Sequence, residues 1–350
     1  MVATSPGGEP FPGACWPIIE TCSKIRTMAS SRFPFPTPFG WFQVAFPDDL
    51  APGEVTALEY WSRELVLWRD LAGEFHLQDA FCPHLGAHLA YGGTVREEEL
   101  QCPFHGWRFD GEGTCKNIPY SQRTNRKARL RTYPTVVRNG FVLAWFHPNG
   151  EPPQWEIPVI DEIGDPAWSN FYSSSYVIRT VPQEMSENGV DPAHFQFVHG
   201  TDDVAEMVSY DTEGPCSVML SKQSYVTPRG VTHGRIDVYN YGPGFSKVWF
   251  SGIVDAINIA TTTPIDDETT QVRFNFIVRK FDDEKLTSTV AAAFVKEINK
   301  QVQEDQPIWE HKVFLPSPAL ADTDGPILKF RKWYSQFYIE DVPQAAGQAL

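Results

Sequence analysis

The chain of 350 residues has no apolar run of about 18 residues, the minimum expected of a membrane-spanning helix. Its first residues also lack the basic start and long apolar stretch of a secretory signal. A positive charge balance is missing too, because the formal net charge is −15. Such an acidic balance argues against a nucleic-acid partner. These absences favour a cytoplasmic protein with no membrane span and no nucleic-acid partner.

Cysteine is scarce, with six residues in the whole chain, and two of them stand close to histidines. In a secreted protein an even number of cysteines suggests disulfides, whereas metal binding is the better interpretation in a cytosolic chain of this size. The six are Cys15, Cys22, Cys82, Cys102, Cys115 and Cys216.

The pattern of residue types along the chain predicts two domains and an N-terminal arm. Residues 1–38 are rich in Gly, Pro and Ser and predict an irregular arm. Residues 39–150 alternate short aromatic and β-branched runs with turn residues, which predicts a compact all-β domain. The proline-rich stretch NGEPPQWEIP reads as a linker. Residues 151–342 form the second domain, and residues 343–350 a short tail.

The second domain mixes long strand-like runs with helical segments. Four strand-rich stretches between residues 216 and 281 predict a large antiparallel sheet. The segment 182–200 predicts a helix with a break at Pro192, because proline lacks a backbone donor. Residues 286–312 predict one long helix, since apolar residues recur there at helical spacing. The expected fold class is therefore α+β, with an all-β domain first and helices packed to one side of a sheet after it.

The first candidate metal site has the pattern Cys82-x-His84, seventeen residues, then Cys102-x2-His105. Two thiolates and two imidazoles suit tetrahedral zinc, which is one alternative. However, both halves occur in similar loops, CPHLG and CPFHG, whose Pro and Gly let the backbone approach a larger object. Such loops favour a [2Fe–2S] cluster with the cysteines on one iron and the histidines on the other. Cys115 has no partner at ligand spacing and is expected to be a buried small side chain.

The second candidate metal site lies in SENGVDPAHFQFVHG, where His194 and His199 are five residues apart and Asp191 precedes them. Two histidines and one carboxylate form the facial triad that holds Fe(II) with positions left open. The carboxylate must come from elsewhere in the chain. Asp305 stands out because it lies on the long helix, one turn before Trp309. The residues considered are Asp282, Asp283, Glu297, Glu304, Asp305 and Glu310.

Together these patterns resemble the oxygenase components of Rieske non-haem iron oxygenases, over nearly the whole chain after residue 38. The resemblance implies a Rieske [2Fe–2S] domain followed by a catalytic domain of helix-grip type. It also implies one cluster and one mononuclear Fe(II) per subunit. The implied cluster ligands are Cys82, His84, Cys102 and His105, and the implied iron ligands are His194, His199 and Asp305. In that family, the residue matching Asp191 links one subunit's iron site to the neighbouring subunit's cluster histidine, here His105.

Three segments carry a narrower resemblance, to ketosteroid 9α-hydroxylases and cholesterol 7-desaturases: CPFHGWRFDGEGTCKNIPY, PQWEIP and HKVFLPSPALADTDGPILKFRKWYSQFY. This likeness implies a monooxygenase that hydroxylates an apolar substrate, a steroid or sterol, with O2. Electrons would come from an NAD(P)H-dependent reductase or ferredoxin, and the implied assembly is a homotrimer. The alternatives are a sterol desaturase, an oxygenase for another aromatic or apolar compound, and a Rieske electron carrier.

Two further groups of residues have both a functional and an ordinary interpretation. Asn188 and Glu187 are candidates to support the iron-site histidines, and the alternative for Glu187 is a place on the helix surface. Lys116, Arg123, Arg126 and Lys127 lie in a run without acids, which is either a solvated loop or a docking patch for an acidic reductase. Some aromatic side chains could line a substrate pocket or belong to the core: Phe195, Phe197, Trp249, Phe250 and Trp309.

Overall fold

The computed structural model describes residues 32–201, 203–227 and 230–339. The expected irregular arm therefore lies outside the described residues except for positions 32–38, and the expected tail lies outside entirely. Residues 33–38 form neither helix nor strand. Phe33 and Phe35 are nevertheless buried in one hydrophobic cluster with Phe330 and Tyr334 of helix α4 (Ile327–Tyr334). This short stretch is thus packed in place.

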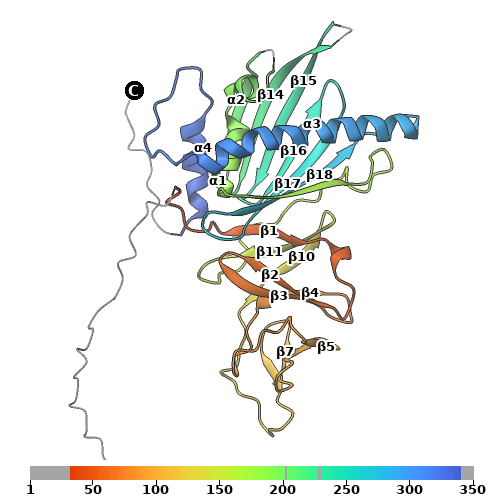
Figure 1. Ribbon diagram of the computed structural model, residues 1–350, viewed down its shortest axis with the longest axis vertical. Coiled ribbons are helices and arrows are strands. Elements are labelled where there is room, and N and C mark those ends of the chain that lie inside the picture. Colours follow the sequence, from red (N-terminus) through yellow and green to blue (C-terminus); the bar gives the residue numbers. More distant parts are fainter. Residues whose placement is uncertain (1–31, 202, 228–229, 340–350) are drawn as a thin grey trace, which may run out of the picture. The chain divides into compact units, whose positions relative to one another are not determined.

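The first domain consists of small antiparallel sheets (Figure 1). One sheet has the order β1-β11-β10, a second β2-β3-β4-β9 and a third β5-β6-β7-β8. The strands are β1 (Gly40–Ala45), β2 (Val55–Tyr60), β3 (Arg63–Arg69), β4 (Phe75–Asp79), β5 (Thr94–Arg96), β6 (Glu99–Gln101), β7 (Arg108–Asp110), β8 (Cys115–Asn117), β9 (Thr132–Tyr133), β10 (Thr135–Arg138) and β11 (Phe141–Phe146). A single 3-10 turn, η1 (Pro47–Asp49), follows β1.

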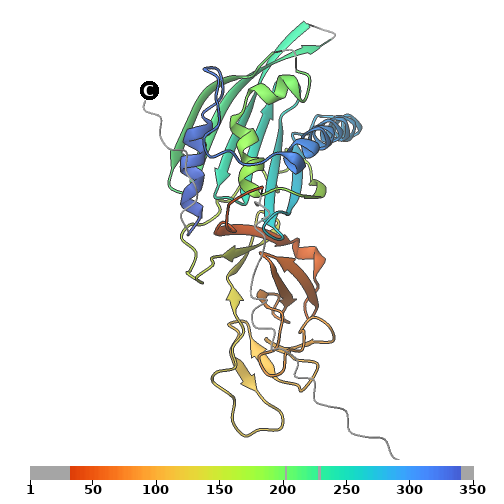
Figure 2. The same ribbon diagram turned by 60° about the vertical axis from the view of Figure 1, so that its left-hand side comes forward.

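The second domain is built on one seven-stranded antiparallel sheet with the order β12-β18-β17-β16-β15-β14-β13. Its strands are β12 (Tyr172–Ile178), β13 (Glu206–Glu213), β14 (Cys216–Thr227), β15 (Gly230–Tyr241), β16 (Phe245–Ser251), β17 (Ala256–Pro264) and β18 (Thr270–Val278). The helices lie on one face of this sheet, as Figure 2 shows. They are α1 (Pro182–Glu187), η2 (Asn188–Val190), α2 (Ala193–Phe197), α3 (Glu284–His311), α4 and η3 (Ser335–Phe337).

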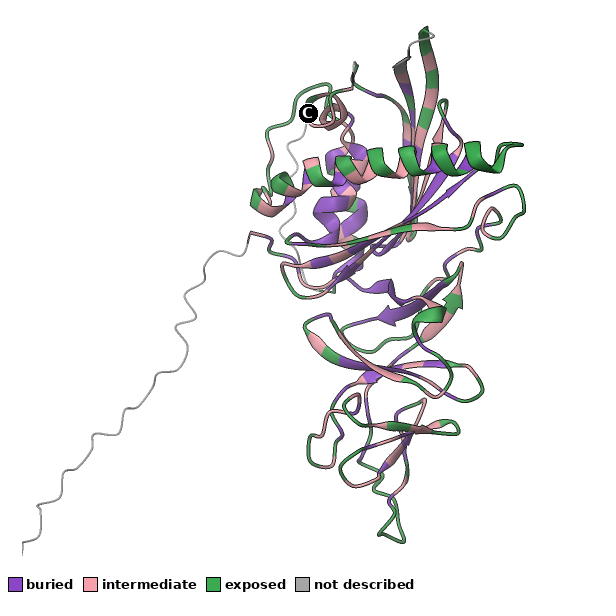
Figure 3. Ribbon diagram, turned by 45° about the vertical axis from the view of Figure 1, so that its right-hand side comes forward, coloured by how far each residue is buried: buried purple, intermediate pink, exposed green. Residues whose placement is uncertain are grey.

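The long helix α3 begins where the side chain of Asp283 accepts hydrogen bonds from the backbone N–H groups of Lys285 and Leu286. An aspartate at this position satisfies donors that the first helical turn leaves free. The buried residues of α3 are separated by 4, 11, 3 and 4 positions, which are close to whole numbers of helical turns, so they share one face, while the outer face of the helix is exposed (Figure 3). They are Thr287, Ala291, Val302, Asp305 and Trp309.

The α+β fold class, the large antiparallel sheet and the long helix are confirmed. The helical segment before residue 200 is broken as predicted, because α1 and η2 end at Val190 and α2 begins after Pro192. Helix α4 was not predicted. Its eight residues, ILKFRKWY, are too few to show a sustained period. The helix is stabilised by the packing of its apolar face.

The two domains are joined by a buried polar contact centred on Arg273 of β18. Its guanidinium donates to the backbone carbonyl of Gln43 at 3.1 Å, to the hydroxyl of Tyr60 at 2.8 Å and to Gln271 at 2.9 Å. Thr261 and Thr263 of β17 donate to the side-chain and backbone oxygens of Gln43, both at 2.7 Å. Only 8 % of Arg273 is exposed, and its bonds to Gln43 and Tyr60 are buried.

Replacing Arg273 by Met should therefore lower the free energy of unfolding by roughly 2–4 kcal/mol, because the change keeps the aliphatic volume but leaves buried acceptors without a donor. The measurement is thermal unfolding followed by circular dichroism. Arg279→Met is the control, since Arg279 is exposed and 3.8 Å from Asp255, and it should change the unfolding free energy by less than about 0.5 kcal/mol. Equal melting temperatures for the two variants would contradict this account of the domain interface.

Candidate functional site

The two Cys/His loops of the first domain have the same backbone geometry. In the first, Cys82 N–H donates to Ala87 O at 2.8 Å and Gly86 N–H donates to Cys82 O at 2.9 Å. In the second, Cys102 N–H donates to Trp107 O at 2.8 Å and Gly106 N–H donates to Cys102 O at 3.1 Å.

Both glycines of these loops have positive φ, 76° for Gly86 and 70° for Gly106. Residues with a side chain rarely adopt this conformation, so the glycine in each sequence is what closes the loop. The two loops therefore present their ligands as a matched pair.

The side chains on these loops fit a [2Fe–2S] cluster. Cys82 and Cys102 are buried next to each other, and burial, together with the neighbouring Cys102, raises the pKa of the Cys82 thiol to about 12. Bound iron would hold such thiols as thiolates. The rings of His84 and His105 lie 4.6 Å apart. His105 Nδ1 is buried without a hydrogen-bond partner among the described residues, so it is free to bind a metal.

Aromatic packing shields this site. The ring of His84 stacks on Trp107 at 4.4 Å and 10°, and Trp107 Nε1 donates to the hydroxyl of Tyr120 at 2.7 Å. Cys115 is buried in the same hydrophobic cluster as Cys82 and Cys102, as expected for a small core side chain.

In the second domain the structure brings His194, His199 and Asp305 together, with one potential ligand atom of each within 4.8 Å of the others. His194 lies on α2 and His199 just after it, while Asp305 comes from α3. Asp191 shapes the start of α2, because its carboxylate accepts from Ala193 N–H at 3.1 Å. Its backbone oxygen lies 2.5 Å from His194 Nδ1. The other ring nitrogen, Nε2, is thereby left for a metal.

Glu304 orients His199 in the way that the carbonyl of Asp191 orients His194. Its carboxylate lies 3.1 Å from His199 Nδ1, and Asp305 lies 3.4 Å from His199 Nε2. Glu304 was considered as a metal ligand on sequence grounds, and the structure places it instead behind the histidine. Two acidic residues in succession on α3 therefore contact the two nitrogens of one ring.

The electrostatics of the two histidines differ. Burial lowers the pKa of His194. Burial also acts to lower the pKa of His199, but hydrogen bonds and charge from Asp305 and Glu304 outweigh it and raise that pKa. Two imidazoles and one carboxylate form the donor set of the facial triad, so these residues could hold Fe(II).

A cavity of about 190 Å³ opens onto these three residues. Phe195, Phe250 and Trp309 line it, as sequence reasoning allowed, whereas Phe197 is 81 % exposed and Trp249 packs on Trp168. Half of the remaining lining residues are aliphatic or aromatic. They include Met185, Ile236, Val238, Val248, Phe274, Ile298 and Val302.

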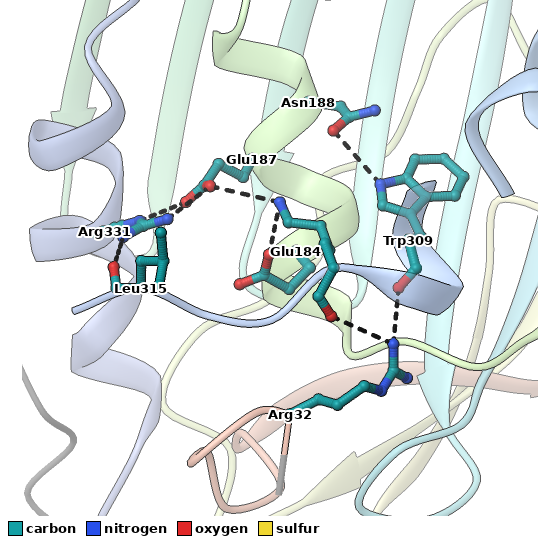
Figure 4. A network of polar contacts seen from close by, with 8 residues as sticks. Arg32, Glu184, Glu187, Asn188, Trp309, Leu315 and Arg331 are labelled. Carbon is teal, nitrogen blue, oxygen red and sulfur yellow. Dashed lines mark hydrogen bonds and ion pairs between the residues drawn. The ribbon is translucent and has the colours of Figure 1, made fainter. Parts of the chain in front are cut away.

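A network of polar contacts ties the helices around the cavity (Figure 4). Arg331 of α4 donates to both carboxylate oxygens of Glu187, at 2.6 and 2.8 Å. Lys312 lies 2.7 Å from Glu184, and Trp309 Nε1 donates to Asn188 Oδ1 at 3.4 Å. Glu187 thus pairs with cations and Asn188 with a tryptophan. Among the described residues, neither side chain forms a hydrogen bond with His194 or His199, so the expected support of these histidines is not observed.

The basic run of the first domain is largely exposed. Lys116 lies 3.7 Å from Asp110. Arg123, Arg126 and Lys127 are exposed, and no carboxylate of the described residues pairs with them. They form a cationic surface on the loop between β8 and β9.

Comparison with known proteins places the chain in a family. Residues 40–134 match the Rieske [2Fe-2S] domain, and residues 144–338 match the 3-Ketosteroid 9alpha-hydroxylase C-terminal domain. The chain belongs to the Rieske oxygenases that carry this C-terminal domain.

Two relatives and one solved structure illustrate the likeness. The oxygenase component of 3-ketosteroid-9-alpha-monooxygenase from Rhodococcus rhodochrous is 29 % identical, over 91 % of this chain and 88 % of the relative. Cholesterol 7-desaturase from Caenorhabditis elegans is 31 % identical, over 93 % and 82 %. Dicamba monooxygenase bound to dicamba shares the fold with a TM-score of 0.68 at 19 % identity, over 85 % of this chain and 96 % of that one.

This oxygenase is therefore an oxidoreductase with a Rieske cluster and a mononuclear iron. As an oxygenase component it uses O2 and receives electrons from a separate reductase. Among the described residues, no helix is both long and apolar enough to cross a membrane.

Replacing Cys102 by Ala should abolish the visible absorption of the cluster, because one iron loses a thiolate. Cys115→Ala is the matched control: it removes a thiol from the same buried cluster of residues, and it should leave the red-brown colour and its bleaching by dithionite unchanged. The measurement is the visible spectrum together with iron and zinc content. A Cys102→Ala protein that keeps its spectrum, or a wild-type protein that holds zinc alone, would contradict the assignment.

Proposed function

We propose that this oxygenase hydroxylates a steroid or sterol, and that the substrate binds in the cavity beside His194, His199 and Asp305. The observation that carries the proposal is the apolar lining of a cavity that ends at these residues. A rigid, apolar, multi-ring molecule suits such a lining. Relatives named for ketosteroids and for cholesterol support the same class of substrate. A cytoplasmic location stays a prediction.

We assign the cluster to Cys82, His84, Cys102 and His105, and the mononuclear iron to His194, His199 and Asp305. The iron supplies O2 activation when it is bound. The chain's own residues orient the site: Glu304 holds the ring of His199, and the carbonyl of Asp191 holds the ring of His194. The cavity wall keeps the substrate beside them and excludes water through Met185, Val302 and Trp309.

Substrate turnover tests the function. The protein, a compatible reductase and NAD(P)H are incubated with a panel of steroids and isotopically labelled O2, and the products are analysed by mass spectrometry. Hydroxylation should add one labelled oxygen atom, whereas a desaturase would remove two hydrogen atoms and add no oxygen.

Asp305→Ala is the control for this assay, and it should lose the mononuclear iron and all product while it keeps the cluster spectrum. Conversion of an unrelated aromatic compound, with every steroid left unchanged, would refute the proposed substrate class.

We further propose that the subunits form a homotrimer in which Asp191 carries the electronic link from one subunit's His105 to the next subunit's iron site. Apolar side chains beside the cluster ligands support this contact, because Phe81, Leu85 and Phe104 are 46, 66 and 61 % exposed. Exposed apolar residues grouped in this way are typical of protein interfaces.

Mixed oligomers test the link. Asp191→Ala and Cys102→Ala subunits should each be inactive alone, the first with both metals and the second without a cluster. Co-expressed in one cell, they should regain turnover, because a cluster on an Asp191→Ala subunit can then serve the intact iron site of its neighbour. Mixing Asp191→Ala with Asp305→Ala is the control for random recovery. No recovery, or full activity of Asp191→Ala alone, would contradict the intersubunit route.

The reductase is proposed to dock near the cationic loop that carries Arg123, Arg126 and Lys127, with Lys116 at its edge. The overall charge of −15 makes this group of exposed cations a local exception. An acidic electron donor would be steered toward it by charge.

A further inference from the structure

The last turns of α3 carry two parts of the site, and the helix does not hold this segment fully by itself. Asp305, one of the three residues of the candidate iron site, lies two residues before Pro307, which is inside the helix. Proline has no backbone N–H, so the carbonyl of Gln303 receives no helical hydrogen bond from this position. Trp309, which lines the cavity, follows directly. The segment that connects Asp305 with the cavity wall therefore has one helical bond fewer than an ordinary turn.

The carbonyls at the end of α3 are satisfied by arginines from distant parts of the chain. A helix has no donors of its own for its last carbonyls. Arg32 Nη1 donates to Trp309 O at 3.1 Å and to Lys312 O at 3.4 Å (Figure 4). Arg179 donates to Glu310 O at 2.9 Å, and Arg32 Nη2 donates to Arg179 O at 2.7 Å. Two linked cations thus lie at the negative end of the helix dipole, where positive charge is favourable.

Arg32 is held in place by its own neighbours. Its guanidinium lies over the ring of Phe33, 4.7 Å from the ring centre, and Phe33 is 2 % exposed. The backbone oxygen of Arg32 accepts a hydrogen bond from Phe314 N–H at 2.9 Å. The side chain is therefore anchored on both sides, although Trp309 lies 277 positions further along the chain.

Trp309 connects this end of α3 to the histidine segment. It is 4 % exposed, and its Nε1 donates to Asn188 Oδ1 at 3.4 Å. The backbone oxygen of Asn188 in turn accepts from Asp191 N–H at 3.2 Å. The carbonyl of Asp191 is the group that orients His194. A continuous series of contacts therefore runs from Arg32 through the end of α3 to the metal-binding histidines.

We propose that Arg32 is a positioning residue for the iron site: by holding the carbonyls at the end of α3, it fixes Asp305 relative to the two histidines. Arg32 is not among the residues that line the cavity, so it acts through the backbone of the helix. Without it, the end of α3 would move, Asp305 would meet the histidines less often, and the metal would be released more readily. This inference rests on the proposed assignment of the iron to His194, His199 and Asp305.

Release of Fe(II) to a chelator tests this role without any turnover. The iron-loaded protein and its Arg32→Ala variant are mixed with a colour-forming Fe(II) chelator, and the visible spectrum reports whether the cluster stays intact. The variant should release its mononuclear iron roughly tenfold faster, as expected when the support of a metal ligand is lost, and its cluster absorption should be unchanged. Millimolar guanidinium chloride, far below denaturing concentrations, should restore slow release, whereas NaCl at the same concentration should not.

Arg131→Ala is the matched control. Arg131 also donates to two backbone carbonyls, those of His147 and Pro148, at 2.7 and 3.1 Å, and its guanidinium lies over the ring of Tyr133. These contacts are remote from α3 in the fold, so this variant should release iron at the wild-type rate with or without guanidinium. A merely structural role of Arg32 would also give faster release, but a general loss of stability would not be reversed by a denaturant ion.

Arg32→Lys keeps the inference testable if Arg32→Ala does not fold. Lysine keeps the charge, but its ammonium group cannot reproduce the planar fork that reaches three carbonyls, so this variant should still release iron faster than the wild type. A wild-type release rate in the folded Arg32 variants, or fast release from Arg32→Ala that guanidinium does not reverse, would overturn the role of Arg32 while the metal assignment stands. Mononuclear iron retained by Asp305→Ala would instead refute the metal assignment, and this inference with it.

Discussion

The bidentate ion pair between Arg331 and Glu187 is the contact on which the geometry of the second metal site depends. The histidines and Asp305 are more than one hundred residues apart in the sequence, yet their ligand atoms lie within 4.8 Å. Helices α1 and α2 have only six and five residues, and helices this short are not stable alone. Their position must come from tertiary contacts, and Glu187 ends α1 just before the histidine segment.

The same part of the fold is packed too closely to rearrange. A side chain at Gly325, just before α4, would collide with the backbone oxygen of Val190 and with Pro192. The backbone that leads into α4 thus touches the residues that flank Asp191. On the other side, Lys312 pairs with Glu184, a carboxyl whose pKa is raised by burial. Buried ion pairs of this kind contribute little net stability, but losing one partner leaves a charge uncompensated. We interpret the network as a device that fixes one arrangement of α1, α3 and α4.

The parts of the site that sequence could predict are those set by local spacing. Cys82-x-His84 and Cys102-x2-His105 each lie within one loop, and a glycine of positive φ closes each loop. His194 and His199 likewise share one segment, and Pro192 breaks the helix before them. Asp305 could be favoured because the apolar face of a long helix is visible in sequence.

The contacts that sequence reasoning missed are tertiary. In the sequence, Glu304 cannot be told apart from an acidic residue on the exposed face of the helix. Nothing in the sequence indicates that it contacts His199. Glu187 and Asn188 have the right residue types to support the histidines, but their partners come from α4 and the end of α3. The hydrogen bond from Asn275 N–H to the side-chain oxygen of Asn258 likewise appears only once β17 and β18 are paired.

For a steroid substrate, selectivity in this cavity would depend on the shape of its apolar surface. An apolar wall attracts a steroid through burial, but burial is not directional and does not choose between orientations of a flat molecule. The shape of the wall adds direction, because a rigid ring system fits only where it does not collide with Met185, Val302 and Trp309. The carbon that would face His194, His199 and Asp305 is then set by how the ring system lies against these side chains. Since misplacement by about 1 Å is costly for reaction rate, the cavity wall and the metal site on the helices would together determine which C–H bond is attacked.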